Sequence, residues 1–265
     1  MLEEHGIDRP AFAFLVSGVA LQPDEGSRIE DVLNPYPTVF DGWLAAGATA
    51  RGAGLVEEVG GRWRATPKGR VLAARVRAEA DAYLASLRPL PADELARLAG
   101  LLGDARTALE DSDLPRDHMT RTARFVAGSD ASIPMVALEN ALFGLWMARD
   151  DAHMSTWREA GFTGPVLDVL TRLWRREATD LDQLAAKLTQ QRPADVRAAI
   201  ARLRDDGLVA AEGLGLTAQG EAARRQIEDE TDDRFFAPWP DHVGAQAAWI
   251  GERLRRVNAA LLATA

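Results

Sequence analysis

One short pattern occurs twice in this chain of 265 residues and constrains its fold more than any other feature. Each copy consists of Gly-Leu-Val, a short glycine-containing stretch and then Thr-x-x-Gly. The copies cover residues 54–69 and 207–220, and Thr66 and Thr217 are 151 residues apart. Because a repeat of this kind indicates one structural unit used twice, the sequence predicts two related units in one chain.

The residues around each copy predict helices joined to a hairpin. In the second copy, apolar residues at helical spacing predict helices over residues 165–175 and 194–206, and Asp180 is expected to cap a helix between them. In the first copy, Thr38 is expected to cap the third helix, and residues 56–64 predict two short strands joined at a glycine pair. Three helices followed by a hairpin form a winged helix-turn-helix, whose third helix enters the DNA major groove.

Long helices are predicted after each hairpin, and prolines interrupt them. The predicted fold is therefore mainly α, with two tandem winged helix-turn-helix units that carry long helical arms and are related by a pseudo-two-fold axis. A helix over residues 135–149 is expected between the two units. The predicted domains are a first unit with its arm at 1–110, a helical connector at 111–162 and a second unit with its arm at 163–265.

Composition narrows the class of protein. The chain has no cysteine, which excludes disulfides and thiolate sites, and the cytoplasm is the expected compartment. Its longest early apolar run, residues 11–21, is too short to span a bilayer and lacks the flanks of a secretion signal. A net charge of -9 argues against a nonspecific polyanion binder, because phosphate contacts need a local excess of lysine and arginine.

DNA contacts are predicted at the turn and third helix of the second copy and in the first hairpin, where side chains could donate to base edges or phosphates. The alternative is that these are ordinary solvated side chains. Local charge is small: residues 181–212 carry five cations and five anions, and residues 28–75 carry seven cations and five anions. The candidate DNA-binding residues are Gln190, Gln191, Arg192, Arg197, Arg62, Arg64 and Lys68.

Aromatic residues suggest a second role. The chain has seven tryptophans but only two tyrosines, and several aromatic residues fall in the central segment or the second half. If they lined the seam between the two lobes, they would suit a planar ligand; the alternative is plain core packing. The candidate ligand-binding residues are Phe143, Trp146, His153, Trp157 and Trp239.

Motifs for catalysis and metal binding are missing. The chain has no Gly-x-Ser-x-Gly elbow, no phosphate loop and no His-Glu-x-x-His motif. His153, with Asp150 and Asp151 nearby, is expected to be a surface cap or a satisfied histidine rather than a metal ligand. We therefore predict no catalytic residues, no metal and no cofactor, although an enzyme built from convergent pocket residues stays open.

Residues 182–220 resemble MarR-type winged helix-turn-helix regulators, on Leu184-Ala185-Ala186, the turn at Gln190-Gln191 and the Thr217-x-x-Gly re-entry. The larger plan is similar to an actinobacterial family of tandem winged-helix proteins. The resemblance implies a DNA-binding transcription regulator, and in MarR-type proteins a basic wing also touches DNA. The second wing of this chain departs from that pattern, because its residues 212–215 carry no cation.

Two functions are therefore predicted. The first is a ligand-responsive, MarR-like transcription regulator that binds double-stranded DNA. The alternative is a winged-helix scaffold that no longer binds DNA and instead binds a small aromatic molecule at the seam, for sequestration or in specialised metabolism. No membrane partner is expected, and the chain is either a monomer with an internal pseudo-dimer or a homodimer.

Overall fold

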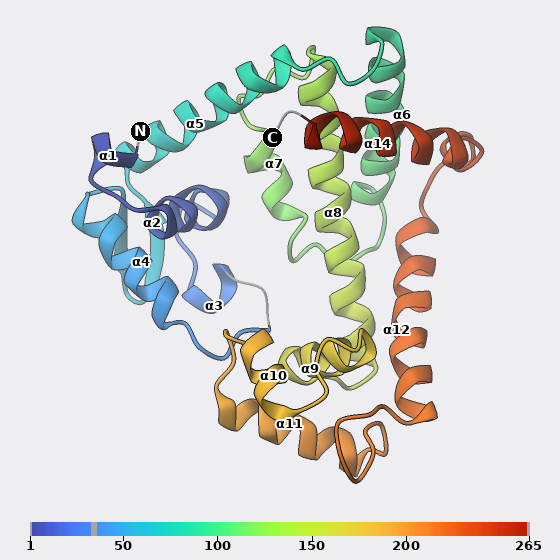
Figure 1. Cartoon of the computed structure of the whole chain (residues 1–265). Coiled ribbons are helices and arrows are strands. Elements are labelled where there is room, and N and C mark those ends of the chain that lie inside the picture. Colours follow the sequence, from blue (N-terminus) through green and yellow to red (C-terminus); the bar gives the residue numbers. More distant parts are fainter. Residues whose placement is uncertain (1, 33–35, 264–265) are drawn as a thin grey trace. The chain divides into compact units, whose positions relative to one another are not determined.

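The computed structural model describes residues 2–32 and 36–263, and this part of the chain is mainly helical (Figure 1). Among these residues there is one sheet, an antiparallel pair of short strands. The prediction of a mainly α fold is confirmed. The chain forms two compact units: unit 1 contains residues 1–70 and 153–231, and unit 2 contains residues 71–152 and 232–265.

Unit 1 begins with what we call the first module, its described residues from 2 to 70. Its core is built around Phe14, which is fully buried and meets Trp63 edge-on with the ring centroids 5.2 Å apart. The hairpin prediction is confirmed, since Val56 pairs with Ala65 across a turn that contains Gly60 and Gly61. The elements are α1 (Leu2–His5), α2 (Arg9–Ala13), a π-helical turn (Phe14–Gly18), a 3-10 turn (Val19–Leu21), α3 (Ile29–Val32), α4 (Asp41–Gly52), β1 (Val56–Val59), β2 (Arg62–Ala65) and the start of α5 (Pro67–Ser86).

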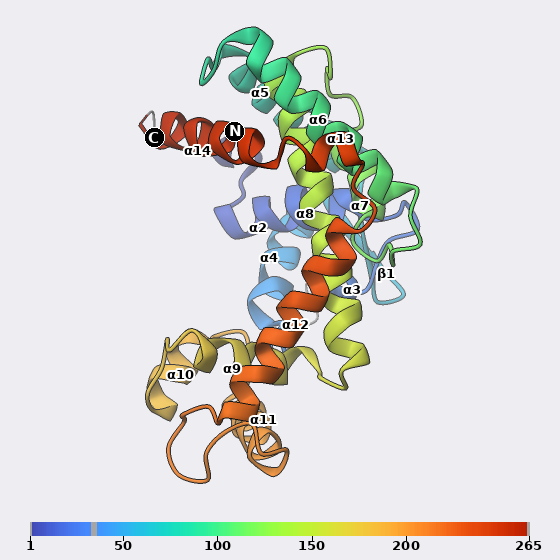
Figure 2. The same ribbon diagram turned by 90° about the vertical axis from the view of Figure 1, so that its right-hand side faces the viewer.

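The rest of unit 1 is the second module, residues 153–231. Figure 2 shows its helices α9, α10 and α11 gathered in one compact group. A buried apolar cluster that includes Leu170, Leu184 and Leu203 lies between them. The elements are the end of α8 (Pro134–Glu159), α9 (Gly164–Trp174), α10 (Leu181–Lys187), α11 (Pro193–Asp205) and most of α12 (Ala218–Phe236).

The repeated pattern has the same hydrogen bonds in both modules. In the first, the Thr66 hydroxyl donates to the carbonyl of Gly54 at 2.7 Å and accepts from the amide of Gly69 at 3.1 Å. In the second, the Thr217 hydroxyl donates to the carbonyl of Gly207 at 2.7 Å and accepts from the amide of Gly220 at 3.0 Å. A threonine therefore joins the end of the third helix to the start of the next long helix in each module.

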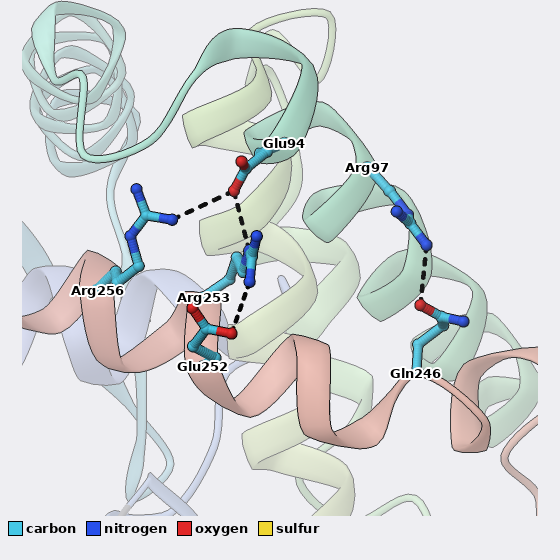
Figure 3. A network of polar contacts seen from close by, with 6 residues as sticks. All are labelled: Glu94, Arg97, Gln246, Glu252, Arg253 and Arg256. Carbon is cyan, nitrogen blue, oxygen red and sulfur yellow. Dashed lines mark hydrogen bonds and ion pairs between the residues drawn. The ribbon is translucent and has the colours of Figure 1, made fainter.

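Unit 2 contains the arms and has a core of its own, in which α6 and α8 share buried residues such as Leu98, Leu102 and Leu138. Its last helix is fastened to α6 by polar contacts (Figure 3). The Arg253 guanidinium donates to Glu94 at 2.9 Å and Arg97 donates to Gln246 at 2.8 Å. Besides parts of α5, α8 and α12, its elements are α6 (Ala92–Glu110), α7 (Thr120–Val126), α13 (Asp241–Gly244) and α14 (Ala247–Leu262).

Three local predictions need correction. The helix expected over residues 135–149 continues to Glu159, because no proline or glycine interrupts residues 145–159. The second hairpin has no strand ladder and is held by a single bridge between Val209 and Leu216. The third helix of the first module begins at Asp41, and Thr38 does not cap it. The predicted division into 1–110, 111–162 and 163–265 stays a prediction beside the two interleaved units.

Candidate nucleic-acid interface

The exposed face of α11 follows from the spacing of its apolar residues. Val196, Ala199, Ile200 and Leu203 are all buried against the second module's core. Since these positions share one side of the helix, the other side, with Ala194, Arg197 and Ala201, is exposed. Helix α10 begins at the predicted cap, where the Asp180 carboxylate accepts the amide of Gln183 at 2.9 Å. The chain therefore folds as three helices with the third one open to solvent.

The turn before α11 is fixed from within the module. Gln191 is 5% exposed, and its side-chain amide donates to the carboxylate of Asp168 on α9 at 3.1 Å. Burial raises the pKa of Asp168, while the charge of Arg172 and the bond from Gln191 act in the opposite direction. Gln191 was predicted to contact DNA; in this structure its side chain supports the turn from inside.

The four arginines in and beside α11 divide into two pairs. Arg202 forms an ion pair with Asp206 at 2.7 Å. Arg204 donates to the carbonyl of Gly213 at 2.7 Å and so ties the wing loop to the helix. The side chains of Arg192 and Arg197 are exposed and make no hydrogen bond or ion pair with any described residue. Those two guanidinium groups have their donors available for an external acceptor.

The second wing carries no cation. Glu212 is its only charged residue, and it lies in the exposed loop beside Gly213, whose φ is +74°. That positive φ favours glycine at the tip of the turn. Because a carboxylate faces phosphates unfavourably, this wing is poorly suited to contact the DNA backbone.

The predicted basic residues of the first wing all bond within the first module. Arg62 donates to the carbonyl of Gly26 at 3.0 Å, Arg64 pairs with Glu57 at 2.8 Å, and the Lys68 amine donates to the carbonyl of Ala53 at 2.8 Å. Because these contacts are partly exposed, replacing them by contacts with phosphates would cost little free energy. Their predicted phosphate contacts stay predictions.

One contact that was not predicted joins the two modules within unit 1. The carbonyl of Gln190 accepts the amides of Thr38 at 2.8 Å and Val39 at 3.0 Å. The Thr38 hydroxyl in turn accepts the amide of Arg192 at 2.9 Å. Only the backbone of Gln190 and Arg192 takes part, and both residues remain exposed. No local pattern could have predicted this contact, because its partners are 154 positions apart.

The aromatic candidates divide between the two units. In unit 1, Trp157 is buried beside Tyr36 and the His153 ring bonds the Thr231 hydroxyl at 3.1 Å. In unit 2, three further candidates have aromatic neighbours: Phe143 stacks on Phe125, Trp146 is 61% exposed with Phe143 edge-on to it, and Trp239 packs against Phe235 and Phe236. Their predicted role in binding a small aromatic ligand stays a prediction.

The acidic residues near His153 have different roles. In unit 2, Asp151 is buried and its carboxylate accepts the amides of His118 at 2.6 Å and Met119 at 2.8 Å, so it caps a backbone turn. Asp150 lies 3.7 Å from the His118 ring. Within the described part of the chain, no three histidine or acidic side chains are grouped to hold a metal ion.

No helix among the described residues combines the length and apolar character needed to cross a membrane. In a comparison with known protein families, residues 131–265, about half of the chain, match a helix-turn-helix family. No curated protein and no solved structure matches. The matched region contains all of α9, α10 and α11.

Proposed function

The chain belongs to this helix-turn-helix family, and from that premise we propose that it is a transcription regulator of the winged, MarR-like type that reads double-stranded DNA with α11. The observation that carries the proposal is the exposed face of α11 and the turn before it, where the side chains of Arg197 and Arg192 make no hydrogen bond or ion pair with any described residue. Both residues lie toward the amino end of the helix. In helix-turn-helix proteins, this end of the second helix of the motif contacts base edges.

The chemistry of the two arginines suits DNA. A guanidinium group can donate two parallel hydrogen bonds to O6 and N7 of guanine, or one or more to a phosphate. Arg192 precedes the helix and Arg197 lies in its second turn, so the two can reach successive positions along a groove. We propose that Gln190 accompanies them, because its side chain lies at the exposed turn. Gln191 is left out of this set because it is buried.

The identical threonine bonds in the two modules support a tandem winged-helix arrangement. Both junctions use a hydroxyl to join a glycine carbonyl to a glycine amide, with distances that agree within 0.1 Å. The first module is a poorer reader of DNA, since Arg51, the only cation of α4, pairs with Glu58 at 3.0 Å. We therefore propose that the second module makes the base contacts. Response to a small ligand stays a prediction.

Binding to duplex DNA tests this function directly. The full chain would be titrated, over a series of salt concentrations, against a labelled duplex from the region upstream of its own gene and against duplexes selected from a random pool. Arg197→Ala should weaken binding by about tenfold and lower the slope of log K against log salt by about one, as loss of one DNA contact does.

The matched control is Arg225→Ala, because Arg225 is exposed on α12 and pairs with Glu221 within its own helix. This variant should bind as the unaltered chain does. Absence of binding to any duplex at low salt would refute the proposed function. Equal weakening by Arg225→Ala and Arg197→Ala would refute the assignment of α11 as the reading helix.

A further inference from the structure

We infer that Thr38, in the first module, is a positioning residue for DNA binding by the second module. This inference rests on the proposed function, since the turn that Thr38 holds is the one that leads into α11. Thr38 is three residues before α4, and no DNA contact is assigned to it. The inference is that the first module acts as a support for the reading helix.

The first step is the set of hydrogen bonds, which we call the turn clamp: Thr38 and Val39 donate their amides to the carbonyl of Gln190, and the Thr38 hydroxyl accepts the amide of Arg192. The bonds run in both directions across two adjacent peptide units. They therefore fix the orientation of the turn as well as its distance from the first module.

The second step is the missing local cap at the start of α11. Arg192 is the residue before the helix and its side chain does not cap it. In a capping box, a glutamate or glutamine at the third helical position would bond the amide of the residue before the helix. That third position holds the shorter Asp195, for which the described residues show no such bond. The Thr38 hydroxyl bonds this amide instead.

The third step is the support of the clamp by two neighbouring contacts. Within the second module, Gln191 bonds Asp168 of α9. Between the modules, Tyr36 of the first packs beside the buried Trp157 of the second, with ring centroids 6.1 Å apart. Three consecutive residues, 190 to 192, are thus each held by a bond, and two of the three bond to residues 38–39.

The two modules therefore have different roles: the first supports the turn and the second contacts DNA. The clamp uses backbone atoms of Gln190 and Arg192 and leaves their side chains exposed to an external partner. Loss of the clamp should therefore loosen the amino end of α11 without removing a single cation. Affinity for DNA would fall because the turn must be ordered on binding, and the number of released counterions would stay the same.

The test is Thr38→Val in the full chain. Valine keeps the branched shape and the two amide donors but removes the hydroxyl acceptor. We expect the dissociation constant for the selected duplex to rise about 3- to 10-fold, with the slope of log K against log salt unchanged. Hydrogen exchange at the Arg192 amide should become faster. Thr38→Ser, which keeps the hydroxyl, should restore both values toward those of the unaltered chain.

Thr49→Val is the matched control, because Thr49 is an exposed threonine of the same module whose hydroxyl bonds only the Ala45 carbonyl of its own helix, at 3.2 Å. It should change neither affinity nor exchange at Arg192. Far-ultraviolet circular dichroism and thermal unfolding would verify that all variants are folded.

Three results would overturn the inference: an unchanged affinity of Thr38→Val, an unchanged exchange rate at Arg192, or a changed salt slope, which would make Thr38 a direct DNA contact. Failure of the proposed function is a separate result. In that case the unaltered chain binds no duplex, yet exchange at Arg192 still differs between Thr38→Val and Thr38→Ser.

Discussion

The glycines that end the two Thr-x-x-Gly patterns are required by a close backbone approach. A Cβ atom built on Gly69 would lie 1.9 Å from the carbonyl oxygen of Leu55, and one built on Gly220 would lie 2.0 Å from that of Leu208. These distances are far below van der Waals contact, and the obstacle is backbone that cannot rotate away. The sequence repeat thus marks a position where any side chain would push the long helix away from the backbone that follows the third helix.

Gly220→Ala should therefore destabilise the protein by about 3 kcal/mol, as overpacking against rigid structure does. The measurement is the free energy of unfolding from urea denaturation. Gly100→Ala is the control, because Gly100 is exposed on α6 and nothing lies within 4 Å of a Cβ atom there. It should leave stability unchanged or raise it by up to about 1 kcal/mol. Equal effects of the two substitutions would contradict the proposed close approach.

Prediction at the scale of single elements was best where the signal is local. The helix expected over 165–175 is found at Gly164–Trp174, and the one expected over 194–206 is found at Pro193–Asp205. Apolar spacing and a proline in the first turn predict both helices without help from the rest of the chain, and Gly207 follows the second one. The first hairpin was predicted for the same reason, since two glycines with positive φ join its strands.

Elements that depend on distant contacts were predicted less well. Helix α2 changes to a π-helical turn at Phe14, whose side chain is packed against Trp63, and no local pattern predicted this change. The second wing has glycines at 213 and 215 but only one bridge, and its carbonyls at Ala210 and Gly213 accept hydrogen bonds from Arg204. In both cases tertiary contacts decide the backbone hydrogen bonds.

The acidic charge of the second wing leads to a prediction at this scale. If α11 reads the groove, Glu212 lies on the loop that follows it, and repulsion from phosphate weakens binding. Glu212→Lys should tighten binding to the selected duplex about 5-fold or more at low salt and steepen the salt slope by about one. Fluorescence anisotropy measures both quantities.

Asp229→Lys makes the same change of charge on the exposed side of α12 and serves as the comparison. It should have the smaller effect. If both substitutions tighten binding equally, net charge and not the wing is responsible, and the second wing would then lie away from the DNA.

At the scale of the whole molecule, the sequence predicted two related modules but not how they are combined. Unit 1 draws on both halves of the chain, and its turn clamp joins residues 154 positions apart. Neither half carries a local pattern that predicts the contact between residues 38–39 and residues 190–192. The same limit applies to the candidate site. Its arginines could be chosen from sequence, but the burial of Gln191 and the hydrogen bond from Arg204 to the Gly213 carbonyl depend on the folded module.

The small number of available cations sets the expected salt dependence of DNA binding. The chain has a net charge of -9, and among the described residues near the turn before α11 the exposed cations that form no ion pair are Lys187, Arg192 and Arg197. With about three phosphate contacts, log K should fall against log salt with a slope of about -3. Titrations between 50 and 200 mM salt measure this value. A slope near -8 would mean that a larger basic surface, outside α11, binds the DNA.

The turn clamp also affects how the protein is made. A ribosome adds roughly 5 to 20 residues per second, so residues 36–39 emerge on the order of ten seconds before the turn that they will hold. For most of that interval, until Trp157 has been made, Tyr36 lacks the tryptophan that packs beside it. The nascent first module therefore presents an unfinished surface to chaperones and proteases until synthesis has passed residue 192.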